Sequence, residues 1–298
     1  MDGTLQNLVQ DKLSPRGIWQ LMEPTRSVLR RQISLLPKRS VSEIDARYPV
    51  TPASMRAFLE AFFTRYYFQI QNSLVSYTTS PDFLDLVSSG HLRILDIGSG
   101  PAVAALAIMD LVGCLLECAQ TMGGWPTIRI IDVTYVLNDT SAICLAVAQR
   151  MLADYFHRWR GYGTAVVRSR TFSMQMPFPS NMHQIGRIAR NVGTYDIIIL
   201  SYVVGPLVED SGLDTLVNEL LSVGKLCTHN GRILIVQDRF RGALMQRISR
   251  AVGITTHREE LTQEVYPDRD VGEIRSYWYY DCLYGPSDET VTHQSLVA

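Results

Sequence analysis

The segment from His91 to Val112, HLRILDIGSGPAVAALAIMDLV, constrains the fold of this chain more than any other. A short apolar run, Ile94–Leu95, leads into Asp96 and then into a turn with glycines at positions 98 and 100. The alanine-rich stretch that follows has the composition of a helix. A strand, a glycine-rich turn and a helix in this order are typical of the opening unit of an α/β domain that binds a nucleotide.

The glycines of this turn let the backbone approach a ligand closely, because no Cβ stands in the way. A helix that begins near Pro101 directs its unpaired N–H groups at the same place, so an anionic group is favoured there. Two kinds of ligand fit: the pyrophosphate of a dinucleotide, or the carboxylate of S-adenosylmethionine. A dinucleotide site needs a small residue at position 103, and the chain has Val103.

The spacing Asp96-x-Gly98-x-Gly100 resembles motif I of the class I S-adenosylmethionine-dependent methyltransferases, with Ala102 in place of the family's third glycine. The resemblance implies S-adenosylmethionine as the cofactor. It also implies that the turn shapes the site for the methionine end through the consecutive residues Asp96, Ile97, Gly98, Ser99, Gly100 and Pro101. The alternative is a turn that only caps a helix in another α/β protein.

The composition, 46% apolar and 19% charged, is typical of a globular protein. With 298 residues the chain is long enough for one large domain with an extension. The formal net charge of −1 provides no overall attraction to nucleic acid or to an anionic membrane. The five cysteines are scattered without zinc-ligand spacing, so we expect no metal site and reduced thiols. The N-terminus has no signal-like apolar run, and the stretch Ala102–Ala119 is interrupted by Asp110 and Glu117. We therefore expect a cytoplasmic protein that does not enter a membrane.

Residues 1–88 read as a helical extension or cap, with helices over Ile18–Leu35, Ala53–Tyr77 and Pro81–Ser88. Beyond residue 90 strands and helices alternate, which predicts a doubly wound, mostly parallel sheet in an α/β fold. The expected strands are 93–97, 128–137, 165–172, 196–202 and 232–237, and the expected helices are 102–121, 141–159, 213–228 and 241–252.

The aromatic stretch Glu273–Gly285 suits late antiparallel strands. The whole pattern over Leu92–Gly285 resembles the seven-stranded sheet of class I methyltransferases, in the order 3-2-1-4-5-7-6. We expect a methyltransferase domain over residues 89–286 and a C-terminal tail over 287–298.

The second strand should bring an acidic side chain to the ribose hydroxyls, because one carboxylate can accept from both of them. Asp132 lies within the apolar run, whereas Asp139 closes it and precedes Thr140. The family pattern of an acid, a serine two residues later and an alanine nine residues later is met by Asp139, Ser141 and Ala148. Both aspartates stay candidates, with Thr140 beside the site. The third strand should end beside the adenine at Phe172, which could equally be core packing.

The fourth strand carries Ser201 and Tyr202 at its carboxyl end, where ligands of doubly wound sheets lie, so both should border the transferred methyl group. Asp196 begins this strand and has a structural role. The strand end lacks the N-P-P-Y-like tetrad that the family uses for exocyclic amide and amine methylation. It also lacks the carboxylates that a metal-assisted reaction needs. What remains is transfer to an O, N or S atom that is already nucleophilic or needs only a modest base.

The face of an aromatic ring attracts a sulfonium cation. Tyr67 is therefore a candidate catalytic residue, alongside Tyr66, Tyr77 and Tyr202. The expected acceptor is a small molecule or a peptide group. Arginine clusters over 158–170 and 239–250 keep an RNA methyltransferase open as an alternative. A catalytically inactive subunit that uses the fold for interactions is a third possibility.

Overall fold

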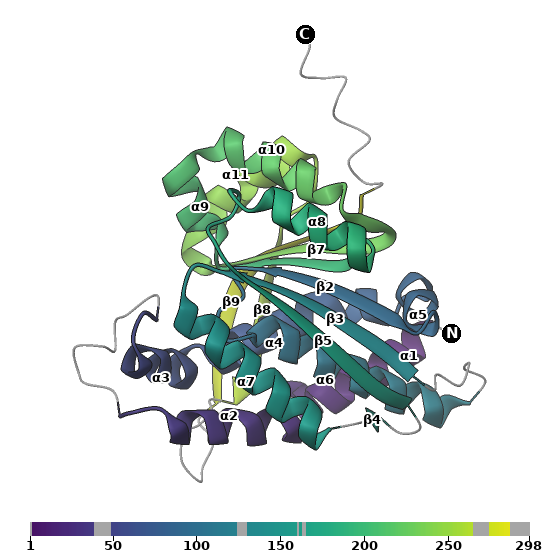
Figure 1. The fold of residues 1–298 in the computed structure, drawn as a ribbon. Helices are drawn as coiled ribbons and strands as arrows, with labels where there is room; N and C mark the ends of the chain where they lie inside the picture. The colour runs from purple at the N-terminus through teal and green to yellow at the C-terminus, as the bar shows by residue number, and fades with distance from the viewer. Residues whose placement is uncertain are drawn as a thin grey trace.

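The computed structural model describes residues 2–38, 49–123, 130–159, 161–162, 165–264 and 274–286. At its centre is a nine-stranded sheet in the order β1-β8-β9-β7-β6-β2-β3-β5-β4 (Figure 1). The strands are β1 (Ile18–Trp19), β2 (His91–Ile97), β3 (Ile130–Asp139), β4 (Gly161–Tyr162), β5 (Ala165–Gln175), β6 (Tyr195–Ser201), β7 (Cys227–Asp238), β8 (His257–Glu264) and β9 (Ile274–Tyr284).

The seven longer strands confirm the predicted topology. Numbered from β2 and without the two short strands, their order across the sheet is 3-2-1-4-5-7-6. Strands β5, β3, β2, β6 and β7 run parallel, whereas β9 is antiparallel to both β7 and β8. This is the sheet of the class I methyltransferase fold. The two-residue strands β1 and β4 extend the sheet at its edges and were not predicted.

Helices cover both faces of this sheet (Figure 1). One face carries α1 (Asp2–Leu13), α2 (Glu23–Leu35), α3 (Pro52–Ala61), α4 (Phe63–Thr78), α6 (Val103–Met122) and α7 (Ala142–Arg158), with α5 (Pro81–Ser88) at the start of β2. The other face carries α8 (Met182–Val192), α9 (Val204–Ser211), α10 (Leu213–Gly224) and α11 (Gly242–Val252). The central strands alternate between the two cores: Ile94 packs in the first and Leu95 in the second. Burial on both faces explains why these strands read as continuous apolar runs.

Helix α6 is the one described helix that is long and apolar enough to cross a membrane by length and composition. Its most apolar window is 89% buried inside the protein. Residues of α1, α2, α4 and α7 join it in one buried cluster. The apolar character of α6 is therefore accounted for by its place in the core.

The N-terminal segment departs from the prediction in two places. The predicted helix over Ile18–Leu35 begins only at Glu23, because Ile18–Trp19 forms β1 and pairs with β8. The predicted helix over Ala53–Tyr77 is two helices that break at Phe62, where the backbone leaves helical geometry at φ −122°. Thr51 caps the first of them, because its side chain accepts the N–H of Ser54.

The C-terminal half contains elements that the sequence did not reveal. Helices α8 and α9 were missed, and β5 continues to Gln175 instead of ending at Phe172. The aromatic stretch forms one strand, β9, whose hairpin partner β8 is the polar segment HREELTQE. The predicted tail, 287–298, lies outside the described residues.

Candidate functional site

The glycine-rich turn joins β2 to α6 through three backbone positions in the left-handed region: Gly98 (φ +71°), Gly100 (φ +52°) and Ala102 (φ +63°). A Cβ on Gly98 would lie 2.8 Å from the Cβ of Val203, so only glycine fits there. A Cβ on Gly100 would meet nothing within 4 Å, so space is open beside this residue. The turn thus packs tightly on the segment after β6 and leaves its outer glycine uncovered.

Asp139 holds the turn in place. Its Oδ2 accepts the N–H of Gly100 at 2.8 Å, and its Oδ1 accepts the N–H of Ser141 at 2.8 Å. The carbonyl of Asn138 accepts the N–H groups of both Gly98 and Ser99. Burial raises the pKa of Asp139, and the backbone N–H donors oppose that rise. The end of β3 is therefore a clamp on the turn, and exposed Thr140 follows it at the same edge.

Asp132 lies at the opposite edge of the sheet, so its prediction as a ribose ligand is wrong. It pairs in register with His91 at the start of β2, whereas Asn138 pairs with Ile97 at the end. Seven residues of strand separate Asp132 from Asp139, which is about 23 Å. The guanidinium of Arg168 donates to both oxygens of Asp132, at 2.6 and 2.7 Å, and holds the pKa of Asp132 below its ordinary value.

Polar atoms without partners surround the turn. Asp96 is fully buried, and neither carboxylate oxygen has a hydrogen-bond partner among the described residues. Burial raises the pKa of Asp96 from 3.8 to about 7. The Ser99 hydroxyl is likewise buried and unpartnered within the described part of the chain. The nearby start of α6 has no side-chain cap. Native proteins rarely leave such groups unmet, so this cluster points to a polar ligand.

Ser201 and Tyr202 lie at the carboxyl end of β6, as predicted from the sequence, next to the Val203 that contacts Gly98. Tyr202 adopts a left-handed backbone (φ +62°), which is unusual for a bulky residue, and its N–H donates to the carbonyl of Val236. Its ring lies against Tyr66 of α4, with 3.6 Å between ring centroids and 19° between ring planes. Burial raises the pKa of Tyr202 well above its ordinary range.

Tyr67 is not at this site, so its prediction as a catalytic residue is wrong. Its side chain is fully buried and donates to Oδ2 of Asp110 at 2.5 Å, inside the layer formed by α4, α6 and α7. Tyr155 donates to the other oxygen of the same aspartate at 2.7 Å. The neighbouring Tyr66 faces Tyr202 instead. Tyr77 lies at the far end of α4, where its hydroxyl donates to the carbonyl of Asn230.

Phe172 is half-buried in the second core and pairs in register with Val136, three residues before β5 ends. The end of β5 presents Met174 and Gln175 instead, which the sequence analysis missed. The amide of Asn138 donates to the carbonyls of Met174 and Met176 and so links this strand end to the clamp on the turn. The polar–apolar alternation that continues beyond position 172 was the signal for the longer strand.

Asp196 lies outside this cluster and has protein partners. Asp196, at the start of β6, accepts the N–H of Arg93 and the hydroxyl of Thr228, which fits its predicted structural role. Within the described residues, no group of three or more His, Cys, Asp or Glu side chains could hold a metal ion. The site comprises a glycine-rich turn, a carboxylate without a hydrogen-bond partner among the described residues, and an aromatic pair, all at one edge of the sheet.

No protein-family model matches this chain, and no curated protein does. Among solved structures, it is similar to a precorrin-6Y C5,15-methyltransferase from Geobacter metallireducens (9% identity, TM-score 0.39, 70% of this chain and 88% of that one). It is also similar to the METTL16 MTase domain (13% identity, TM-score 0.39, 95% and 88%) and to a human methyltransferase 10 domain containing protein (11%, 0.39, 96% and 98%). The likeness to these structures concerns the fold alone.

Proposed function

We propose that this chain is an S-adenosylmethionine-dependent methyltransferase that methylates an O, N or S atom of a small-molecule or peptide acceptor. The observation that carries the proposal is the turn itself. It combines three left-handed positions, an open Gly100 and a buried, unpartnered Asp96 at the carboxyl edge of a sheet with the 3-2-1-4-5-7-6 order. Ligands of open α/β sheets bind at this edge, near the point where the strand order reverses.

The residues of the turn fit an amino-acid group better than a pyrophosphate. Asp96 offers two acceptors and a negative charge, which suit an ammonium and would repel a phosphate. The start of α6 and the hydroxyl of Ser99 offer donors to a carboxylate. Both charges of the methionine end would therefore find a partner here.

The ribose would lie against the end of β3. The oxygens of Asp139 accept the backbone N–H groups of Gly100 and Ser141, and a carboxylate has about four acceptor positions for hydrogen bonds. Thr140 is exposed beside it and offers a hydroxyl. Asp139 therefore both fixes the turn and remains the proposed ribose ligand, and the adenine would extend toward Met174 and Gln175 on β5.

When bound, the cofactor supplies a methyl group on a positively charged sulfur. That methyl group would be the electrophile for a lone pair of the acceptor atom, and the neutral sulfur compound would be the leaving group. Since the leaving group is good, the chain's own task is to position the acceptor and exclude water. Ser201 and Tyr202 would border the methyl group, with the aromatic ring of Tyr202 near the cation.

The RNA alternative receives less support from the positions of the arginines. Arg168 lies at the amino edge of the sheet in an ion pair with Asp132. Arg239 and Arg241 follow β7 at the carboxyl edge, and Arg241 pairs with Glu209. Arg168 therefore lies at the sheet edge opposite Arg239 and Arg241, whereas an extended RNA would favour arginines that share one surface beside the site.

The experiment is thermal unfolding with S-adenosylhomocysteine or NAD at saturating concentration. We expect S-adenosylhomocysteine to raise the melting temperature by about 5 °C, since a ligand at 100 times its Kd adds about 2.7 kcal/mol. NAD should not raise it. The shift should be smaller for the Asp139→Ala variant and unchanged for the Asp132→Ala variant. A shift with NAD alone would contradict the proposal and favour a dinucleotide site. No shift with either compound would also contradict it and favour an inactive subunit.

A further inference from the structure

The faces of Tyr66 and Tyr202 are pressed together at the place where the acceptor would lie. Their centroids are 3.6 Å apart with 19° between the planes, which is close to a direct sandwich. Two similar rings prefer offset or edge-to-face arrangements with centroids 4.5–7 Å apart, because their negative faces repel. The face of Tyr202 is thus a flat surface for a ring, and Tyr66 covers it in an arrangement that a tyrosine pair does not favour.

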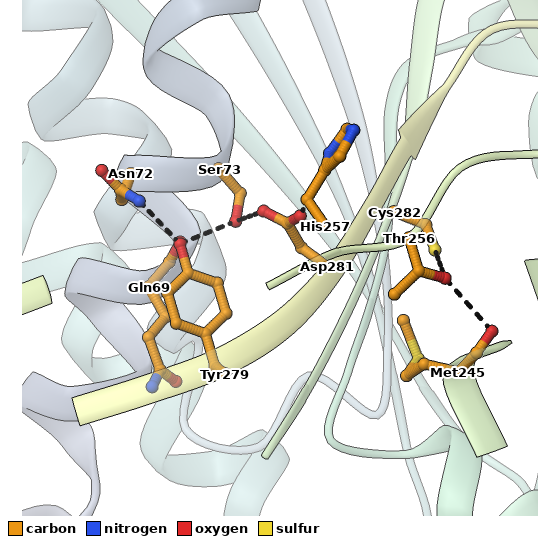
Figure 2. Close-up of polar contacts among 9 residues, drawn as sticks. All are labelled: Gln69, Asn72, Ser73, Met245, Thr256, His257, Tyr279, Asp281 and Cys282. Atoms are coloured by element: carbon orange, nitrogen blue, oxygen red, sulfur yellow. Dashed lines mark hydrogen bonds and ion pairs between the residues drawn. The ribbon is translucent and has the colours of Figure 1, made fainter. Parts of the chain in front are cut away.

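Helix α4, which carries Tyr66, is fastened to the sheet further along its length (Figure 2). Asn72 donates to the hydroxyl of Tyr279 at 2.8 Å, and Ser73 donates to Asp281 at 2.5 Å. Tyr66 lies in the first turn of α4, directly after the break at Phe62. The helix is therefore anchored beyond Tyr66, and the hydrogen bond from Tyr67 to Asp110 holds its first turn as well, so only the side chain of Tyr66 would have to move.

Arg65 places a positive charge beside the ring pair. Its guanidinium lies over the ring of Tyr277 at 5.0 Å, and its Nε is buried without a hydrogen-bond partner in the described part of the chain. Burial raises the pKa of Tyr66 to about 12, and the nearby charge of Arg65 opposes that rise. No ion pair joins Arg65 to a carboxylate within the described residues, and the nearby Asp238 instead accepts the backbone N–H of Phe240.

We propose that the acceptor is a planar aromatic compound with a negative charge, which replaces Tyr66 against the face of Tyr202 while Arg65 binds its anionic group. A ring stacked on Tyr202 would gain the contact that Tyr66 now makes, and an anion would complete the hydrogen bonds of a half-buried guanidinium. The inference rests on the proposed function, since it names the acceptor class of the same site.

Binding is measured by calorimetry on the full chain saturated with S-adenosylhomocysteine, so that occupancy of the cofactor site is established first. The probes are 2-naphthoate, uridine 5′-monophosphate, uridine and cyclohexanecarboxylate. We expect at least one of the two aromatic anions to bind, and the neutral uridine and the non-aromatic carboxylate to bind at least about tenfold more weakly. Which aromatic anion binds distinguishes a small aromatic acid from a nucleotide.

Variants separate the roles of the three side chains. Tyr66→Ala should tighten aromatic-anion binding by about twofold to tenfold, because the ligand no longer displaces a ring, and Tyr66→Phe should restore the wild-type affinity. Tyr202→Leu and Arg65→Gln should weaken binding, whereas Arg258→Gln, which removes a guanidinium lying over Trp278 instead, should not.

Three results would overturn the inference: binding of cyclohexanecarboxylate as tight as that of the aromatic anion that binds, no effect of Tyr66→Ala, or no binding of either aromatic anion to the loaded chain. Each leaves the proposed methyltransferase function standing, because S-adenosylhomocysteine is already bound. Failure of the chain to bind S-adenosylhomocysteine would instead contradict the proposed function itself.

Discussion

Replacement of Asp96 by asparagine should stabilise the folded chain at alkaline pH and weaken cofactor binding at the same time. Burial raises the pKa of Asp96 from 3.8 to about 7, so the folded state resists ionisation of this carboxyl. Below about pH 4 the group is protonated in both the folded and the unfolded chain, and it imposes no penalty. Between about pH 4 and pH 7 only the unfolded chain ionises, so its ionisation lowers the free energy of unfolding as the pH rises.

The shift of about three pKa units corresponds to about 4 kcal/mol, which is the upper limit of the penalty above pH 7. Asparagine has nearly the same shape and no charge, but its amide also lacks hydrogen-bond partners at this buried position. We therefore expect the Asp96→Asn variant to gain about 1–3 kcal/mol at about pH 9 and almost nothing at about pH 4. Asp110 and Asp196 also have a pKa raised by burial to about 6, so only the difference between variant and wild type isolates Asp96.

The assay is denaturant unfolding of both chains across this pH range, with calorimetric titration of S-adenosylhomocysteine at about pH 8. The variant should bind about tenfold to a hundredfold more weakly, because the ammonium loses a charged partner. An identical stability difference at all pH values would refute the assigned ionisation of Asp96. Unchanged affinity would refute its role toward the ammonium.

Three further changes test the remaining geometry. Asp139→Ala should weaken S-adenosylhomocysteine binding by about 1–3 kcal/mol in calorimetry, while Asp132→Ala at the opposite edge leaves it unchanged; equal effects would argue against the clamp. Tyr67→Phe should lower the free energy of unfolding by about 1–3 kcal/mol in denaturant titrations without changing cofactor affinity, since it removes a bond to the buried aspartate of α6. Gly98→Ala should lower the melting temperature, and Val203→Ala in the same chain should restore part of the loss, because it removes the two Val203 methyl groups that would lie 2.9 and 3.3 Å from the new Cβ; if nothing is recovered, the backbone conformation at position 98 is the cause.

The order of the central strands was predictable because a parallel sheet covered on both faces leaves continuous apolar runs in the sequence. The glycine-rich turn was equally predictable, since its positive φ angles and its contact with Val203 require small residues there. Strand β8 was not, because HREELTQE forms a half-exposed strand near the sheet edge with few apolar side chains.

The predictions for Asp132 and Tyr67 failed for the same reason: the sequence does not show where a strand or a helix begins and ends. Asp132 and Asp139 belong to one apolar run, and only the register of β2 with β3 places them at opposite edges. Tyr66 and Tyr67 differ by about 100° around the helix axis, so the position of the break at Phe62 decides which ring reaches Tyr202. Sequence patterns locate such boundaries to within a few residues, which is too coarse to choose between neighbours.

The most direct measurement is a calorimetric titration of the wild-type chain with S-adenosylhomocysteine and, separately, with NAD. The cradle formed by Asp96, Gly100 and the start of α6 predicts that one molecule of S-adenosylhomocysteine binds per chain, with a Kd on the order of micromolar, and that NAD gives no binding heat. Binding of NAD with no response to S-adenosylhomocysteine at about millimolar concentration would contradict the assignment of this turn to an amino-acid group.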